Sequence, residues 1–291
     1  MPERVSPTLL NLPIAVAKQV LEKLEPMDRL TCRKVCKSLR TAIDTIGINF
    51  DSITFEVEDD YVKIIIKNLI IHYTNSEIAV DTEKKKIIKT QDFMERALKD
   101  LGTLIKYAKM LRIMEREFHE DVTPLLEVLE SKKPLFAHQI ILYAFRLSEI
   151  QSILPYFDAK SLTGIILWDI PEEPDSSHYF EQITQLEQWK SAKFLLFRDF
   201  SFDNLPFEQL FHFEKFIIEL ETLTIEHAIK IRDDLMKRDT FRECTIWFKD
   251  NDSFDEIFSP ELNERFTIRF EEEEDFEFGY ESEFKFFVKR N

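Results

Sequence analysis

Ala192-Lys193-Phe194-Leu195-Leu196-Phe197 is a short stretch with apolar residues at its first, fourth and sixth positions. The same spacing recurs at Ala137/Ile140/Leu142, Leu162/Ile165/Leu167, Phe213/Phe216/Ile218 and Phe241/Cys244/Ile246, and Phe266/Ile268 keeps the last two positions. Helical spacing separates several of these windows, at residues 147–156, 178–190 and 224–237. A strand and a helix every ~20–30 residues are typical of leucine-rich-repeat-like solenoids. The sequence therefore predicts a mixed α/β body built like such a solenoid.

The preceding segment has other patterns. Alternating apolar residues at 53, 55 and 57, and again at 62, 64 and 66, predict two short strands. Residues 91–111 show the longest helical spacing, from Phe93 to Ala108 and Leu111 on one face, and predict one long helix. We therefore divide the chain into a helical head at residues 6–48, connecting strands and a long helix at 49–115, and a repeat domain at 116–291.

The composition limits the class of protein. The 291 residues include 4 Gly, too scattered for the phosphate-binding or nucleophile turns that many enzymes need. No catalytic constellation and no metal or cofactor set can be assembled, so we predict a protein that is not an enzyme. The net charge of −16 argues against a nucleic-acid partner, and no apolar run approaches the ~18 residues that span a membrane.

Three cysteines are too few for the disulfide framework of a secreted domain. We therefore expect the protein to act in a reducing compartment, which is the cytoplasm, with the nucleus as a second location. Cys32 and Cys36 are four residues apart, which puts them on one helical face. We interpret them as small core residues rather than zinc ligands, because free cysteine packs like a small apolar residue.

Charge is distributed unevenly along the chain. Residues 1–45 contain 8 basic and 5 acidic residues, whereas residues 251–291 contain 13 acidic and 5 basic residues. A basic head before an acidic body indicates two units with different partners. The acidic body favours basic target proteins through electrostatic steering.

The head contains two helical patterns joined at Pro26. Leu12-Pro13 opens the first, because the first helical turn tolerates the missing amide of proline. Apolar residues continue this helix on one face: Val16, Val20 and Leu24. The second pattern also has an apolar face: Cys32, Val35, Cys36, Leu39 and Ile43. About 40 residues cannot enclose a stable core alone, so the head needs a partner surface.

The order of these residues resembles the F-box family. The family shows an opening Leu-Pro, a helix, a turn and a helix with a Val-Cys-Lys/Arg signature, which this chain matches at Leu12-Pro13 and Val35-Cys36-Lys37. Many F-boxes carry Trp two residues after the basic residue, where this chain has Leu39, as is common in nematode F-box proteins. The resemblance covers residues 6–48.

The resemblance implies that the head docks on a Skp-family adaptor, which links it to a cullin–RING ubiquitin ligase. Each large apolar side chain buried at such an interface contributes roughly 1.5–3 kcal/mol. Alternatively, several of these side chains only hold the helices together. The residues predicted to face the adaptor are Leu10, Leu12, Pro13, Val16, Val20, Leu24 and Leu30.

Residues from about 120 to 270 resemble the FTH domain that follows nematode F-boxes. The likeness is clearest in Phe216-Ile217-Ile218-Glu219-Leu220, in Leu235-Met236 and in Phe241-Arg242-Glu243-Cys244-Thr245-Ile246. It implies protein binding through the strand face. The two resemblances together imply a substrate-recognition adaptor of an SCF-type cullin–RING ligase that binds a target protein for ubiquitination. The alternative is a non-catalytic module that binds or sequesters another protein, such as an RNA-binding translational regulator, outside ubiquitination.

Overall fold

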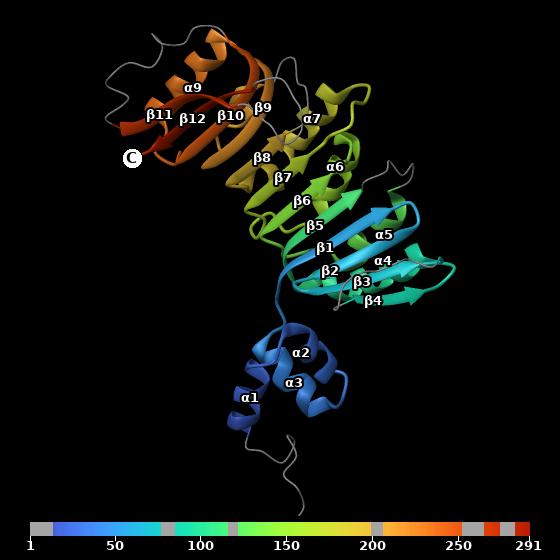
Figure 1. Cartoon of the computed structure of the whole chain (residues 1–291). Helices are drawn as coiled ribbons and strands as arrows, with labels where there is room; N and C mark the ends of the chain where they lie inside the picture. The colour runs from blue at the N-terminus through green and yellow to red at the C-terminus, as the bar shows by residue number, and fades with distance from the viewer. Residues whose placement is uncertain (1–13, 77–84, 116–121, 199–205, 252–264, 274–282) are drawn as a thin grey trace, which may run out of the picture.

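Figure 1 shows a computed structural model of the chain, in which a small helical head leads through a short neck into a larger body of strands and helices. The structure describes residues 14–76, 85–115, 122–198, 206–251, 265–273 and 283–291. The predicted fold class, a mixed α/β protein with a helical head and a leucine-rich-repeat-like body, is confirmed.

The head consists of α1 (Ile14–Glu22), α2 (Pro26–Cys32) and α3 (Lys37–Ile46). Four apolar side chains are buried in it: Leu21, Leu30, Leu39 and Ile43. Pro26 lies in the first turn of α2, where its missing amide costs no hydrogen bond. A turn separates α2 from α3, so Cys32 ends one helix and Cys36 precedes the next. The prediction that one helix carries both cysteines is therefore wrong.

The neck begins at Gly47, which has a φ of +88° and a ψ of 156°. Its amide donates to the carbonyl of Ile43 at 2.7 Å and ends α3. This region of backbone space is essentially restricted to glycine. Ile48 and Phe50, which follow, are buried and lead directly into the first strand.

In the described residues, twelve strands form one sheet in the order β11-β12-β10-β9-β8-β7-β6-β5-β1-β2-β3-β4. Their bounds are β1 Phe50–Glu58, β2 Tyr61–Ile66, β3 Leu69–Thr74, β4 Lys85–Lys89, β5 Ala108–Glu115, β6 Gln139–Tyr143, β7 Gly164–Trp168, β8 Phe194–Arg198, β9 Lys215–Leu223, β10 Glu243–Asn251, β11 Phe266–Glu273 and β12 Glu283–Arg290. The sheet continues from β5 to β6, across the predicted boundary at residues 115/116.

Strands β1 and β5 to β10 are parallel to each neighbour in this run. The helices of the body are α4 Phe93–Leu104, α5 Thr123–Lys132, α6 Leu147–Ile153, α7 Ser176–Gln185, α8 Glu187–Ser191 and α9 Ile225–Lys237. All six repeat windows are strands, as predicted. The strand of the last window, β11, is not next to β10. Strand β12 lies between them and pairs antiparallel to both, so the parallel run ends at β10.

The predicted helix over residues 91–111 is wrong at its end. Helix α4 stops at Leu104, a short 3-10 turn follows, and Ala108 begins β5. Ala108 and Leu111 are three residues apart, which is helical spacing, whereas residues three apart in a strand point to opposite faces. Leu111 and Ile113 alternate with exposed or half-buried residues, and this period of two places β5 in the sheet between β1 and β6.

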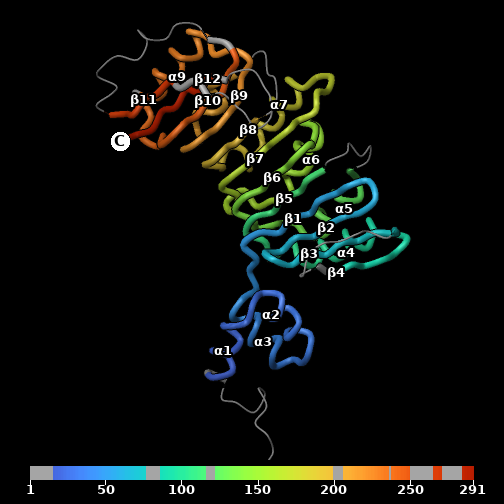
Figure 2. Tube along the Cα trace, in the orientation of Figure 1, coloured from blue at the N-terminus to red at the C-terminus, as the bar shows by residue number. Residues whose placement is uncertain are grey.

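The helices α5, α6, α7 and α9 lie on one side of the strands (Figures 1 and 2). Side chains at alternate strand positions, such as Ile140 and Leu142 of β6, are buried in the core. Side chains at the other positions face the opposite side, which we call the open face. Parallel sheets are normally covered on both faces, so the open face of this sheet is a candidate binding surface.

Candidate functional site

The first candidate surface is apolar and lies on the head. Val16 and Val20 are one helical turn apart on α1, and 42% and 41% of their surfaces are exposed. Residues four apart lie on the same helical face. Val35, in the turn between α2 and α3, is 66% exposed. So much exposed valine on a unit of three short helices indicates a surface that a partner covers.

The predicted adaptor residues are placed differently from one another. Leu10, Leu12 and Pro13 lie outside the described residues, while Val16 and Val20 are exposed. Leu24 is half-buried and packs against the core. Leu30 is only 7% exposed, so it holds the helices together and presents little surface to an adaptor.

The sequence predicts Val35 on the apolar face of a helix, but the structure places it in an exposed turn. Val35 is three residues after Cys32 and four before Leu39, and this helical spacing explains why the sequence predicts a helix where the structure has a turn. The Val-Cys-Lys signature was the signal that could have marked Val35 as a surface residue.

Arg29 fixes the end of α1 against the neck. Its Nε donates to the carbonyl of Leu21 at 3.1 Å, one Nη to that of Glu22 at 2.6 Å, and the other Nη to that of Gly47 at 3.3 Å. Carbonyls at a helix C-terminus lack partners within the helix, and a cation is favourable there. The exposed valines of α1 are therefore held on a rigid support.

A second arginine joins α2 to α3. Arg33 donates two hydrogen bonds to Asp44, from Nε to Oδ1 at 2.5 Å and from Nη2 to Oδ2 at 3.1 Å. Hydrogen bonding from Arg33 lowers the pKa of the Asp44 carboxyl. This two-point contact connects the end of α2 to α3, and as an exposed pair it adds little stability.

The second candidate surface is the open face of the body. Pairing between neighbouring strands aligns one residue from each strand in a line across the face. This line, which we call the central row, consists of Arg112, Ile141, Ile166, Leu196, Ile217, Thr245, Phe287 and Arg269. In the described part of the chain, its apolar members belong neither to the core nor to the side chains packed against it. They are half-buried by their neighbours on the open face.

The sequence pattern contained a signal for this row. The fifth position of each repeat window, which the pattern left unassigned, is Ile141, Ile166, Leu196 or Ile217 in four consecutive strands. A solvent-facing position of a strand normally carries polar residues. Four aliphatic residues there predict contact with another molecule.

A second row, next to the central row, is rich in aromatic residues and consists of Met114, Tyr143, Trp168, Arg198, Glu219, Trp247, Lys285 and Glu271. Arg198 Nε lies 3.4 Å from Glu219 Oε2. The guanidinium of Arg198 and the ammonium of Lys285 each lie 4.8 Å from the centre of the Trp247 ring, which is cation–π distance. Rigid aromatic and arginine side chains of this kind dominate protein interfaces.

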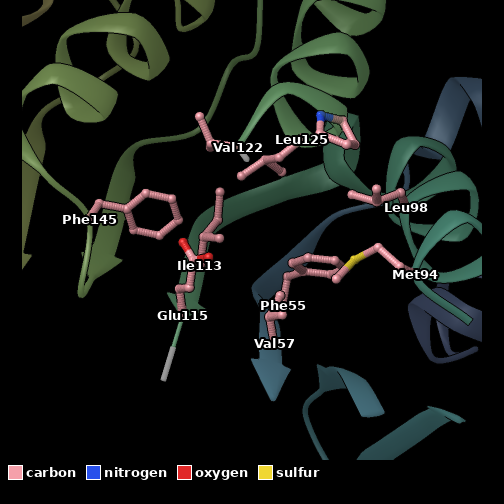
Figure 3. Close-up of a pocket in the computed structure, with 10 residues that line it drawn as sticks. Phe55, Val57, Met94, Leu98, Ile113, Glu115, Val122, Leu125 and Phe145 are labelled. Carbon is pink, nitrogen blue, oxygen red and sulfur yellow. The ribbon is translucent and has the colours of Figure 1, made fainter. Parts of the chain in front are cut away.

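A cavity of about 260 Å³ lies at the carboxyl ends of β1 and β5, beside α4 and α5. Figure 3 shows Phe55, Ile113 and Phe145 around it, with the Glu115 carboxylate at one side. Its ten lining residues include this one carboxylate and no cysteine, histidine, serine or lysine. It can accommodate an apolar group, but it holds no pair of nucleophile and base.

The described residues also offer little for metal or thiol chemistry. They contain no group of three or more His, Cys, Asp or Glu side chains that could hold a metal ion. All three cysteines are free thiols, and burial raises the pKa of Cys244, which makes it unreactive. Among the helices described, none has both the length and the apolar character to cross a membrane.

Comparison with known proteins connects these surfaces to two domains. The model of the F-box domain matches residues 9–51, and the model of the FTH domain matches residues 120–261. The chain is similar to F-box A protein 224 of Caenorhabditis elegans, with 25% identity over 277 residues that cover 88% of this chain and 71% of that protein. The exposed valines lie in the first match and most of the central row in the second. The head therefore contains an F-box domain, and the body that follows it contains an FTH domain.

Proposed function

We propose that this F-box protein is a substrate receptor of an SCF-type cullin–RING ubiquitin ligase. Its head binds a Skp-family adaptor, and the open face of its body binds a target protein. The observation that carries the proposal is the exposed pair of valines on α1 of the F-box, Val16 and Val20. The apolar central row, which another molecule would cover, supports the second half.

The proposed mechanism is proximity. The chain holds a target and the ligase core at the same time, which gives lysines of the target a high effective concentration near the ubiquitin-charged enzyme. The partner enzymes perform the chemistry. Free thiols at all three cysteines support a site of action in the reducing cytoplasm or nucleus.

Co-purification with a Skp-family adaptor tests the first half. We expect Val16→Asp/Val20→Asp to weaken adaptor binding at least about tenfold, because each charge must be desolvated in an apolar interface. The matched control is Ile225→Asp/Ile229→Asp on α9, also one turn apart and 44% and 36% exposed. The control should bind the adaptor like the unmodified chain. Equal binding by the head variant would contradict the proposed adaptor surface.

Target lifetime separates degradation from sequestration. Once a target is identified, its half-life should lengthen in cells that express Val16→Asp/Val20→Asp in place of the unmodified chain. A half-life that does not depend on the adaptor surface would instead indicate a binding protein that acts outside ubiquitination.

A further inference from the structure

We propose that the open face binds an acidic segment of the target, with apolar residues at the centre of the segment and carboxylates on both sides. This inference rests on the proposed function and names the chemical class of target that the body would recognise. It is carried by the order of residues across the sheet and by a local reversal of charge.

The centre of the face is apolar. Ile141, Ile166, Leu196 and Ile217 are contiguous across β6, β7, β8 and β9. All four are half-buried by neighbouring strands and contribute nothing to the core. Because the helices described beside these strands lie on the other side of the sheet (Figure 1), an apolar ligand segment could bury this line of side chains.

Cations border the aliphatic residues of the central row on both sides. Arg112 of β5 lies next to Ile141, where the line continues to Thr54 of β1, and Arg269 lies on β11; both arginines are exposed. Arg198 and Lys285 lie in the second row. Lys215 and Lys289 lie in a third row on the other side of the central row, which consists of Met110, Gln139, Gly164, Phe194, Lys215, Glu243, Lys289 and Thr267.

The three rows together are basic within an acidic protein. From β5 to β11 they contain six Lys or Arg positions and three Glu positions, which are Glu219, Glu243 and Glu271. The net charge of this area is therefore positive, whereas the whole chain carries −16. Glu219 and Glu243 are paired to Arg198 and Lys215 on the same face, so each pair is close to neutral and the positive charge of this area comes from Arg112, Arg269, Lys285 and Lys289.

This charge reversal opposes the expectation of basic targets, which came from the charge of the whole chain. Steering acts through the local potential at the site, and salt screens charges more than about 10 Å away. The acidic residues elsewhere on the chain therefore influence the open face less than its own arginines and lysines.

The spacing of the strands sets the length of the segment. Seven strand-to-strand steps separate β5 from β11, and at about 4.8 Å per step they extend over roughly 34 Å. An extended chain covers about 3.4 Å per residue, so a segment of about ten residues reaches from Arg112 to Arg269. Its acidic residues would meet the cations at the two ends, and its centre would cover the aliphatic side chains.

The test uses the full chain and a fluorescent peptide of about ten residues, with glutamates at both ends and alternating leucine and serine at the centre. A counterpart carries lysine in place of each glutamate. Fluorescence anisotropy should show that the acidic peptide binds at least about tenfold tighter than its counterpart. Raising NaCl from about 50 to about 300 mM should weaken this binding severalfold.

Charge-reversed variants locate the binding. Arg112→Glu/Lys289→Glu should abolish the preference for the acidic peptide. The matched control, Lys99→Glu/Lys190→Glu, makes the same change of net charge on exposed residues of α4 and α8 and should bind like the unmodified chain. Equal binding of both peptides, binding of neither, or an unchanged preference in Arg112→Glu/Lys289→Glu would overturn the inference.

Adaptor co-purification with the same samples separates this result from the proposed function. If the adaptor binds and the acidic peptide shows no preference, the inference fails and the adaptor half of the function stands. If the acidic peptide binds as expected and the adaptor does not bind, the ligase function fails and the peptide surface stands.

Discussion

Two tryptophans of the FTH domain illustrate how the position of a residue determines its role. Trp189 on α8 is fully buried, with ring centroids 5.6 Å from Phe180 and 5.1 Å from Phe213 in edge-to-face contacts. Its Nε1 donates to the carbonyl of Gln209 at 3.3 Å. Trp168 on β7 is half-buried on the open face. The first is a core residue and the second is a candidate contact for a target.

We expect Trp189→Ala to lower the free energy of unfolding by about 3–5 kcal/mol, because it leaves a cavity among aromatic rings. Trp168→Ala should lower it by less than about 1 kcal/mol, since the open face is not packed against the core. Urea denaturation of both variants measures the difference. Equal losses would show that the open face is part of the core.

Two half-buried histidines make stability depend on pH. His212 Nε2 donates to the carbonyl of Trp189 at 2.8 Å, and His227 belongs to the capping box of α9 with Thr224. Burial lowers the pKa of both imidazoles below the ordinary value of about 6.5. The unfolded chain therefore takes up protons at a higher pH than the folded chain does, and the free energy of unfolding falls as the pH drops through about 6.5.

Urea denaturation at about pH 7.5 and 5.5 should show this loss, and His212→Gln should reduce it. Burial raises the pKa of the Glu149 and Asp234 carboxyls, which has the opposite sign and stabilises the fold toward low pH. Carboxyl groups ordinarily titrate near pH 4, so the histidines dominate above pH 5.5. The same loss in His212→Gln as in the unmodified chain would contradict the role of His212.

At the scale of elements, the junction between α3 and β1 depends on one backbone conformation. Gly47 has a φ of +88°, and a Cβ added there would meet only Asn49 Nδ2, at 3.8 Å. The cost of Gly47→Ala is therefore backbone strain, which we expect to lower the free energy of unfolding of the head by about 1–3 kcal/mol. Hydrogen exchange of α3 amides measures it. Asn49→Ala is the control in the same neck and should leave exchange unchanged.

The strands and helices of the repeat body were predictable because each repeat has its own periodic signal. Leu195 and Phe197 alternate within β8, and α9 carries helical spacing over its whole length. Strand β5 was harder to predict because Ala108 and Leu111 keep the spacing of the preceding helix, although Leu111 and Ile113 alternate as in a strand.

The binding surfaces were harder to predict than the elements. The central row exists only once strand register aligns Ile141 with Ile166 and Leu196, which no local pattern specifies. Likewise, the F-box resemblance predicts both Val20 and Leu30 as adaptor contacts, and only tertiary packing shows that Val20 is exposed and Leu30 is buried.

At the scale of the whole molecule, a large body is joined to a head that buries few side chains. In the described chain the buried residues of the head are Leu21, Leu30, Leu39 and Ile43, and they belong to the same core cluster as the many buried residues of the sheet. The pair between Glu25 and Lys67, with Nζ 3.0 Å from Oε1, joins head and body, but it is mostly exposed and contributes little. The two units should therefore differ in local stability.

Hydrogen exchange of the free chain should show faster exchange for amides of α1–α3 than for those of β6–β10, because a unit of this size buries little apolar surface. Addition of a purified Skp-family adaptor should slow exchange in the head and leave the body unchanged, since binding stabilises only the unit that it contacts. Val16→Asp/Val20→Asp should show no slowing. A head as protected as the body in the free chain would mean that its apolar surface is already covered, and α1 would then have no face to offer an adaptor.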